Sequence, residues 1–329
     1  MFIKLNKILK KNLSENEVLS KYSTLGLGGI AKYFYRAETV NDLILSVSTA
    51  QKMKIPCIVL GSGSNVVISD AGFDGLVIKN EARNLSFIKD KAQAIADSGA
   101  LLIRLILESA SYDFGGLEFL YGIPGTVGGA LVSNAGTFGG AIGDFVISAT
   151  LLFPNGSVKR VTKKWFFFNY RDSKLRHLKP MPIILSVKFQ LATNRKEEIM
   201  RKIQQYQKIR ASKQPTEFSA GSFFKNPKVD KNWAKKYLSI IGEEDYTLSD
   251  IVEKTGHIPA GWLLEQSGAK KIRVKSARVS KKHANYIINY KGKAKSAQIK
   301  ELANQLKEEV KEKFGIILEE EIDYLGDFK

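Results

Sequence analysis

The chain has 329 residues, of which 44% are hydrophobic, so it is long enough to form two or three domains with buried cores. No window approaches the run of about 18 apolar residues that a membrane-spanning helix needs. The single cysteine, Cys57, excludes an intrachain disulfide and lies in an apolar run, which predicts a buried core residue. We therefore expect a cytoplasmic globular protein without a membrane partner.

The formal net charge of +18 has three possible meanings. We favour a lysine-rich solvated surface, because the lysines are spread along the chain. A nucleic-acid site and a positive field that draws phosphate-bearing substrates are the alternatives. The densest basic cluster comprises Lys270, Lys271, Arg273, Lys275, Arg278, Lys281 and Lys282. Because no aromatic residue lies among them, base stacking is disfavoured and we expect no nucleic-acid partner.

The first predicted unit, residues 1–80, begins with an amphipathic helix over residues 1–20, where lysines alternate with single apolar residues. Short apolar runs then predict strands at 31–36, 55–60, 66–68 and 76–78. Apolar residues at helical spacing predict a helix over 40–52.

The second predicted unit, residues 81–200, contains a strand at 94–98 and a helix over 101–112. Runs at 146–153 and 158–161, separated by the turn Pro154-Asn155-Gly156-Ser157, predict a hairpin. Alternation over 183–191 predicts another strand.

The third predicted unit, residues 201–329, begins within a basic helix over 197–214 that ends before Pro215 and serves as a linker. We expect helices at 260–266 and 297–314, the latter ending at Gly315, and a strand at 286–289. A final strand over 316–325 is expected to close the chain, with the C-terminal segment near 316–329 packing back on the first unit.

Two glycine-rich loops interrupt these elements. The stretch 121–140 contains seven glycines and Pro124, which predicts turns in place of a regular helix or strand. Tight turns between strands and an anion-binding loop are equally good interpretations of its composition. A second loop, Gly61-Ser62-Gly63-Ser64-Asn65, lies between two apolar runs. Two such loops near strands favour one extended, phosphate-bearing cofactor.

Three further segments carry side chains capable of chemistry. Arg171, beside Tyr170, could clamp a carboxylate, although a surface Arg171–Asp172 turn is the simpler interpretation. Ser222, on a glycine turn beside aromatic residues, could carry a proton to a strongly basic acceptor such as a carbanion, or could merely cap a turn. The triplet 319–321 places charge in the predicted closing strand, where an exposed edge is the common explanation. Strand alternation puts Glu319 and Glu321 on one face.

Metal and serine-hydrolase chemistry are not predicted. His177, His257 and His283 lie far apart in sequence, without ligand spacing, so we expect no metal. No Gly-x-Ser-x-Gly elbow is present.

Taken together, these segments resemble the UDP-N-acetylenolpyruvoylglucosamine reductase family of bacterial cell-wall synthesis over nearly the whole chain. The motifs that carry the resemblance are Gly61-Ser62-Gly63-Ser64-Asn65, Gly116-Leu117-Glu118-Phe119, Gly122-Ile123-Pro124-Gly125-Thr126-Val127-Gly128-Gly129-Ala130, Asn134-Ala135-Gly136, Tyr170-Arg171-Asp172-Ser173, Gly221-Ser222-Phe223-Phe224-Lys225-Asn226-Pro227 and Ser280-Lys281-Lys282-His283-Ala284-Asn285. So many ordered matches make the resemblance specific.

The resemblance implies an α+β, three-domain flavoenzyme. The first two units would form a two-part FAD-binding module of the vanillyl-alcohol-oxidase (PCMH) type, and the third an α+β substrate domain. NADPH would reduce non-covalent FAD, and the enolpyruvyl sugar nucleotide would then be reduced to UDP-N-acetylmuramate. The implied cofactor-binding residues are Gly61, Ser62, Gly63, Ser64, Asn65, Gly122, Ile123, Pro124, Gly125, Thr126, Gly128, Gly129 and Asn134. We expect a monomer.

The resemblance also assigns catalytic roles. Hydride addition at C3 leaves negative charge at C2, and Arg171 and Glu321 match the positions that stabilise the resulting enolate. For Glu321 to help, it should be protonated or share a proton. Ser222 matches the proton donor to C2. Tyr170, Lys213 and Asn226 are the implied substrate contacts.

The chain departs from the family pattern in three places. Ser133 stands where methionine is frequent, residues 273–277 lack the usual glycines, and the segment between Leu191 and Gln214 lacks a long tyrosine-bearing insertion. The last feature indicates the shorter class of the family. A flavin oxidase of the same fold is the alternative; such enzymes often tether FAD through histidine, and the first 176 residues contain none. A nucleic-acid binder has only the charge in its favour.

Overall fold

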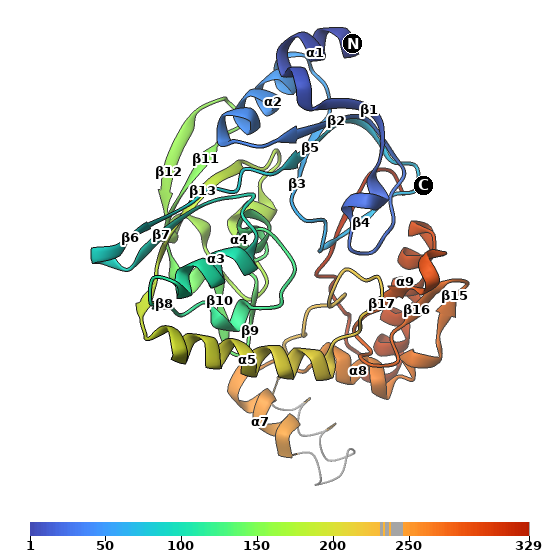
Figure 1. The fold of residues 1–329 in the computed structure, drawn as a ribbon. Helices are drawn as coiled ribbons and strands as arrows, with labels where there is room; N and C mark the ends of the chain where they lie inside the picture. The colour runs from blue at the N-terminus through green and yellow to red at the C-terminus, as the bar shows by residue number, and fades with distance from the viewer. Residues whose placement is uncertain (231–232, 234–236, 238–245, 329) are drawn as a thin grey trace.

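The computed structural model describes residues 1–329 except 231–232, 234–236, 238–245 and 329, and it combines helices and sheets as the predicted α+β class requires (Figure 1). The first sheet has the strand order β1-β2-β5-β3. These strands are β1 (Leu13–Val18), β2 (Ile30–Ala37), β5 (Phe73–Asn80) and β3 (Cys57–Leu60). β1 runs antiparallel to β2, whereas β2, β5 and β3 are parallel.

Helix α2 (Val40–Lys52) packs on this sheet with the predicted bounds. Thr39 begins it: the Asp42 backbone N–H donates to Thr39 Oγ1 at 3.1 Å, and the Thr39 N–H donates to the Asp42 carboxylate at 3.0 Å. This reciprocal cap satisfies two amides at the helix start. Leu43, Val47 and Ala50 form its buried face, and Cys57 is half-buried against the same cluster.

The predicted helix over residues 1–20 is wrong in its second half. Helix α1 covers only Phe2–Leu9, and β1 follows at Leu13. The β1 segment pairs along β2 from Leu13 opposite Tyr35 to Val18 opposite Ile30. The hydrogen bonds offered by a neighbouring strand outweigh weak helical periodicity in a short polar segment.

The second sheet is antiparallel throughout, in the order β12-β11-β13-β7-β6. Its strands are β12 (Val158–Thr162), β11 (Val146–Leu152), β13 (Ile183–Gln190), β7 (Gln93–Asp97) and β6 (Leu85–Ile88). The β11–β12 pair confirms the predicted hairpin. Two small ribbons, β8 (Phe114–Gly115) with β14 (Ala192–Thr193) and β9 (Gly136–Thr137) with β10 (Gly140–Ala141), lie beside it.

Helices α3 (Leu102–Ala110) and α4 (Val127–Val132) pack in the core of this second unit. The expectation of turns throughout the glycine-rich stretch is therefore wrong at 127–132. Thr126 caps α4 by accepting from the Gly129 N–H at 3.2 Å, and Val127 and Leu131 are fully buried. Capping and burial stabilise a short helix despite its two glycines.

Helix α5 (Lys196–Lys213) leads from the second unit to the third, as Figure 1 shows. The third unit contains the small sheet β15 (Arg273–Val274), β16 (Ala277–Val279) and β17 (Ile287–Asn289), together with α7 (Tyr246–Thr255), α8 (Ala260–Gln266) and α9 (Ser296–Phe314). As predicted, α9 presents one apolar stripe and ends at Gly315, whose φ is +68°.

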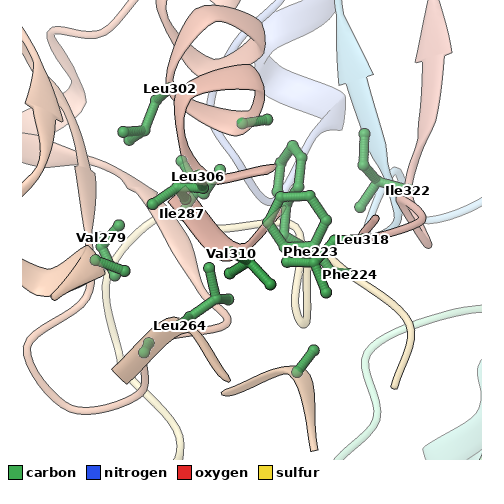
Figure 2. Close-up of a cluster of buried hydrophobic side chains, with 14 of the residues drawn as sticks. Phe223, Phe224, Leu264, Val279, Ile287, Leu302, Leu306, Val310, Leu318 and Ile322 are labelled. Carbon is green, nitrogen blue, oxygen red and sulfur yellow. The ribbon is translucent and has the colours of Figure 1, made fainter. Parts of the chain in front are cut away.

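The core of the third unit surrounds Phe223 and Phe224, which are almost completely buried. Figure 2 shows the two rings beside Leu318, with Leu264, Leu306 and Val310 in the same cluster. The residues next to the candidate proton donor Ser222 are thus anchored in a packed core.

The predicted closing strand over 316–325 is wrong over most of its length. Only β18 (Asp323–Leu325) is a strand, and it pairs in parallel with β4 (Val66–Ile68) of the first unit. Before it, Glu320 forms an isolated bridge with Phe224. The segment cannot continue as one strand because it pairs first with the third unit and then with the first.

Candidate active site

The two glycine-rich loops lie against each other. Ser64 Oγ donates to the Pro124 carbonyl at 2.7 Å, and a Cβ placed on Gly61 would lie 2.7 Å from Thr126 Oγ1. Residues 61–65 follow β3, and residues 122–126 precede α4, so each loop is held by a regular element. Loops that are far apart in the sequence therefore form one continuous surface.

Several amides of this surface are available to a ligand. Within the described residues, no protein group accepts from the backbone N–H groups of Ser62, Gly63, Ser64 or Gly125. Gly63 has φ +63°, and a Cβ there would lie 1.9 Å from the Tyr22 carbonyl oxygen, so only glycine fits. Unpaired amides in irregular backbone attract anions, and this arrangement suits the pyrophosphate of a dinucleotide cofactor.

Other predicted cofactor residues use their polar atoms within the protein. The Gly128 N–H donates to the Ser98 carbonyl at 2.8 Å, and the Gly129 N–H donates to Thr126 Oγ1. Asn134 is buried, donates to the Asn169 carbonyl at 2.8 Å and accepts from the Gly143 N–H at 3.1 Å. These contacts hold the cofactor loop in place.

The candidate catalytic residues Ser222 and Glu321 are brought together by a short backbone pairing. The Glu321 N–H donates to the Phe223 carbonyl and the Lys225 N–H donates to the Glu319 carbonyl, both at 2.8 Å. Asn65 Nδ2 donates to the Glu321 carbonyl at 3.1 Å, which joins the cofactor loop to the same segment.

The three glutamates of this segment meet different partners. Glu319, whose side chain is 72% exposed, pairs with Lys225, while Glu320 pairs with Lys307. Glu321 is 17% exposed and lies 3.0 Å from Arg171 Nε. The strand alternation that was predicted to put Glu319 and Glu321 on one face does not apply, because this segment is not a regular strand.

Arg171 reaches Glu321 from the segment after the second sheet's hairpin. Its backbone has φ +50°, an uncommon conformation for a residue other than glycine. Its guanidinium also donates to the Gly136 carbonyl and lies over the Tyr170 ring, 5.3 Å from the centroid. These contacts fix a positive charge at the junction of the second and third units.

Burial raises the pKa of the Glu321 carboxyl, and this effect outweighs the opposing influence of Arg171. A low-polarity site disfavours the charged form of the carboxyl. The arrangement therefore favours a carboxyl that holds its proton to higher pH than an exposed glutamate does.

Two of the three predicted substrate contacts meet directly. The Asn226 N–H donates to the Tyr170 hydroxyl at 3.3 Å, and Asn226 Oδ1 accepts from the Ala260 N–H at 3.0 Å. Lys213 ends α5 and is exposed, close enough to His283 to help lower the pKa of that imidazole. Of the three residues, Asn226 lines the pocket described below, and Tyr170 is hydrogen-bonded to it.

An open pocket of about 450 Å³ leads to Ser222. Its lining includes Ser222, Asn226, Trp262, Glu265, Lys282 and His283. Burial is the main cause of the lowered pKa of His283, which favours a neutral imidazole at neutral pH. The opening combines the aromatic Trp262 with the cationic Lys282 and the acidic Glu265 near the candidate proton donor.

Sequence analysis did not single out Trp262, Tyr286 or Arg210 as site residues, and His283 entered it only as part of a family motif and as a histidine without ligand spacing. His283 and Trp262 line the pocket, the Tyr286 ring packs edge-on against His283, and Arg210 contributes charge to the same region. Arg210, Trp262 and the segment 283–286 are far apart in the chain, so neither spacing nor composition could group them. In the part of the chain that the structure describes, no group of three or more His, Cys, Asp or Glu side chains could hold a metal ion. Nor is any helix in those ranges long and apolar enough to cross a membrane.

Comparison with known proteins gives consistent matches. The model of an FAD binding domain matches residues 31–162, and that of the UDP-N-acetylenolpyruvoylglucosamine reductase C-terminal domain matches residues 214–325. A UDP-N-acetylenolpyruvoylglucosamine reductase of Acaryochloris marina is 34% identical over 313 residues, covering 94% of this chain and 92% of the relative. One from Moorella thermoacetica is 34% identical over 320 residues, covering 97% and 95%.

A solved structure agrees with these matches. The chain is similar to the crystal structure of UDP-N-acetylenolpyruvylglucosamine reductase from Thermus caldophilus, with a TM-score of 0.72 and 30% sequence identity. The similarity covers 94% of this chain and 98% of that one.

Proposed function

Because this chain belongs to the UDP-N-acetylenolpyruvoylglucosamine reductase family, it is an FAD-dependent oxidoreductase of peptidoglycan synthesis, and we propose that Arg171, Ser222 and Glu321 carry out its reaction. The substrate is the enolpyruvyl ether of UDP-N-acetylglucosamine, and the product is UDP-N-acetylmuramate. The observation that carries the proposal is the convergence of Ser222, Glu321 and Arg171 beside the cofactor loops.

Bound FAD supplies the transfer of a hydride from NADPH to C3 of the enolpyruvyl group. The amides of Ser62, Gly63, Ser64 and Gly125 would hold the cofactor pyrophosphate without a covalent tether. Thr126, Gly128, Gly129 and Asn134 would support that loop through their internal hydrogen bonds. Gly61, Asn65, Gly122, Ile123 and Pro124 complete the proposed cofactor surface.

Negative charge develops at C2 and spreads into the substrate carboxylate when C3 receives the hydride. Arg171 faces this charge with a guanidinium that the protein has already positioned, so little reorganisation is needed. Glu321 in its protonated form donates a hydrogen bond to the enolate. Ser222 then transfers its hydroxyl proton to C2, which an enolate carbon is basic enough to accept.

The sugar nucleotide would lie in the pocket in front of Ser222, with Tyr170, Lys213 and Asn226 as contacts. Trp262 and Lys282 add an aromatic face and a positive charge there. These residues would cover the substrate in the absence of the tyrosine-bearing insertion.

We also propose that units 1–80 and 81–200 bind FAD and that unit 201–329 binds the substrate. Strand β18 returns from the third unit to pair with β4, so the first unit is completed by the end of the chain. A cytoplasmic monomer remains our proposal for location and assembly. Sedimentation of the purified enzyme tests the monomer directly.

The reaction is tested by the visible spectrum of the purified protein in the absence of air. Flavin bands that bleach with NADPH and return with the enolpyruvyl sugar nucleotide are expected, together with FAD release on denaturation. Ser222→Ala should preserve bleaching but slow product formation by about 100-fold or more. Ser86→Ala, on the exposed side of β6, is the matched control. Wild-type product formation by Ser222→Ala would remove the proposed role of Ser222.

A further inference from the structure

Lys79 contacts the first residue of the cofactor loop 61–65. It lies on β5 opposite Leu60, the last residue of the parallel strand β3. Its side chain is partly buried, and its ammonium group donates to the Gly61 carbonyl. In open parallel sheets, ligands bind outside the carboxyl ends of the strands, which is where this lysine stands.

The contact fixes the orientation of one peptide unit of the loop. The Gly61 carbonyl and the Ser62 N–H belong to the same peptide, which is trans. The C=O and N–H groups of a trans peptide point in opposite directions. Lys79 therefore holds the oxygen end, and the Ser62 N–H points away from Lys79. No protein group in the described ranges accepts from that N–H.

The positive charge of Lys79 has no close acidic partner. Among the described residues, no carboxylate forms an ion pair with it, and Glu81 pairs instead with Arg36 at 4.0 Å and with Arg83 at 3.0 Å. Burial lowers the pKa of Lys79, and Arg83 and Arg36 act in the same direction, while Glu81 opposes them. A partly buried cation in such surroundings is stabilised by an anionic ligand.

The next residue of β5 supports the other cofactor loop. Asn80 is buried and donates to Ser98 Oγ at 2.8 Å, and the Ser98 carbonyl accepts from the Gly128 N–H at 2.8 Å. The end of β5 therefore serves both loops through neighbouring side chains. A change at Lys79 is directed at the 61–65 loop alone.

We propose that Lys79 is a positioning residue for the FAD pyrophosphate, with an ammonium group that orients and polarises the Gly61–Ser62 peptide so that the Ser62 N–H binds the anion more strongly. Hydrogen bonds arranged in a chain polarise one another, and a charged donor makes the first of them stronger. Lys79 acts through the peptide and need not touch the cofactor. The inference rests on the proposed function, in which the 61–65 loop binds the pyrophosphate.

The test is titration of full-length Lys79→Gln apoprotein with FAD and, separately, with riboflavin, which lacks the pyrophosphate. The glutamine amide can still donate to the Gly61 carbonyl but carries no charge. The Kd for FAD should rise by at least about tenfold, because a charged donor forms the stronger hydrogen bond. The Kd for riboflavin should not change. Lys79→Arg keeps the charge and should restore most of the FAD affinity.

The matched control is Lys32→Gln. It removes a lysine charge from β2 of the same sheet, where Lys32 pairs with Asp74 at 2.8 Å, and should leave the Kd for FAD unchanged. The unfolding temperature gives a second comparison, since a ligand stabilises the folded state in proportion to its affinity. The rise on saturation with FAD should be smaller in Lys79→Gln than in Lys32→Gln, while the two apoproteins should unfold as the wild type does.

Two results would overturn the inference. One is wild-type affinity for FAD in Lys79→Gln; the other is equal weakening of FAD and riboflavin, which would make Lys79 a support of the fold only. Gly63→Ala separates this failure from that of the proposed function. Wild-type FAD affinity in Gly63→Ala would remove the loop itself as the pyrophosphate site, whereas weakened binding in Gly63→Ala beside normal binding in Lys79→Gln would remove only the role of Lys79.

Discussion

At the scale of single residues, two opposing effects act on the pKa of Glu321, which pairs with Arg171. The two side chains lie 3.0 Å apart, which by itself would favour an ionised carboxylate. Burial nevertheless raises the pKa of Glu321. A site that stabilises an enolate benefits from this balance, because a neutral carboxyl donates a hydrogen bond while the guanidinium keeps its full charge.

The raised pKa of Glu321 predicts a pH dependence of catalysis. The protonated form is populated below the pKa in the folded enzyme and is lost as the pH rises through it. The rate of product formation in single turnover should therefore fall as the pH rises through the pKa of Glu321, which gives the pH–rate profile an alkaline limb. Glu321→Gln, which mimics the neutral acid, should flatten the limb while lowering the rate by about tenfold or more, since the amide is a weaker donor.

The control for this pH profile is Glu319→Gln. The Glu319 side chain is largely exposed, so its replacement should leave the limb in place. A limb that persists unchanged in Glu321→Gln would assign the titration to another group.

The catalytic roles of Arg171, Ser222 and Glu321 could be predicted only from the resemblance of the sequence to a family. Strand alternation placed Glu319 and Glu321 on one face and so could not choose between them, and the strand that was predicted there does not form. Tyr286 escaped prediction because its segment lies beside Ser222 only through the backbone pairing of Phe223 with Asn285, which is far away in the sequence. Contacts of this kind leave no periodic pattern in the chain.

At the scale of elements, amphipathic periodicity predicted long helices well. α2 has the predicted bounds and α9 differs by one residue, since each buries a full apolar stripe. The failures are short elements whose stability depends on a partner: β1 needs β2, and α4 needs the Thr126 cap and its buried face. Local sequence underestimates what tertiary contacts supply.

The cofactor loop offers a prediction at this scale. In Gly63→Ala the new Cβ would collide with the Tyr22 carbonyl oxygen and displace the loop. The Kd for FAD should rise by at least about tenfold, and a tenfold rise corresponds to a loss of about 1.4 kcal/mol of binding free energy. Titration of the apoprotein with FAD measures the change.

Gly156→Ala is the matched control for this loop variant. Gly156 also has positive φ, at +81°, but a Cβ there would meet nothing within 4 Å. Both substitutions carry the backbone cost of about 1–2 kcal/mol, while only Gly63→Ala disturbs the loop. Equal FAD affinity in the two variants would exclude the 61–65 loop as a cofactor contact.

At the scale of the whole molecule, the charge of +18 remains to be assigned. NADPH and the sugar nucleotide are both anionic, so a positive field would accelerate their capture. kcat/KM for the sugar nucleotide should fall by about tenfold between about 0.01 M and 1 M salt, over which screening shortens from about 30 Å to about 3 Å. Oxidation of the reduced flavin by uncharged O₂ should not respond, which controls for salt effects on the fold. A kcat/KM independent of salt would leave the lysines as a solvated surface.

The pairing of β18 with β4 has a consequence for the newly made protein. Asn65 and Glu321, which it brings together, are 256 positions apart. At about 5–20 residues per second, a ribosome needs about 13–50 s to travel that distance. Throughout this interval the nascent first unit has its flavin loop but lacks its last strand. We therefore expect FAD to bind stably only after translation has ended. Only then can Glu321 take its place beside the cofactor loop.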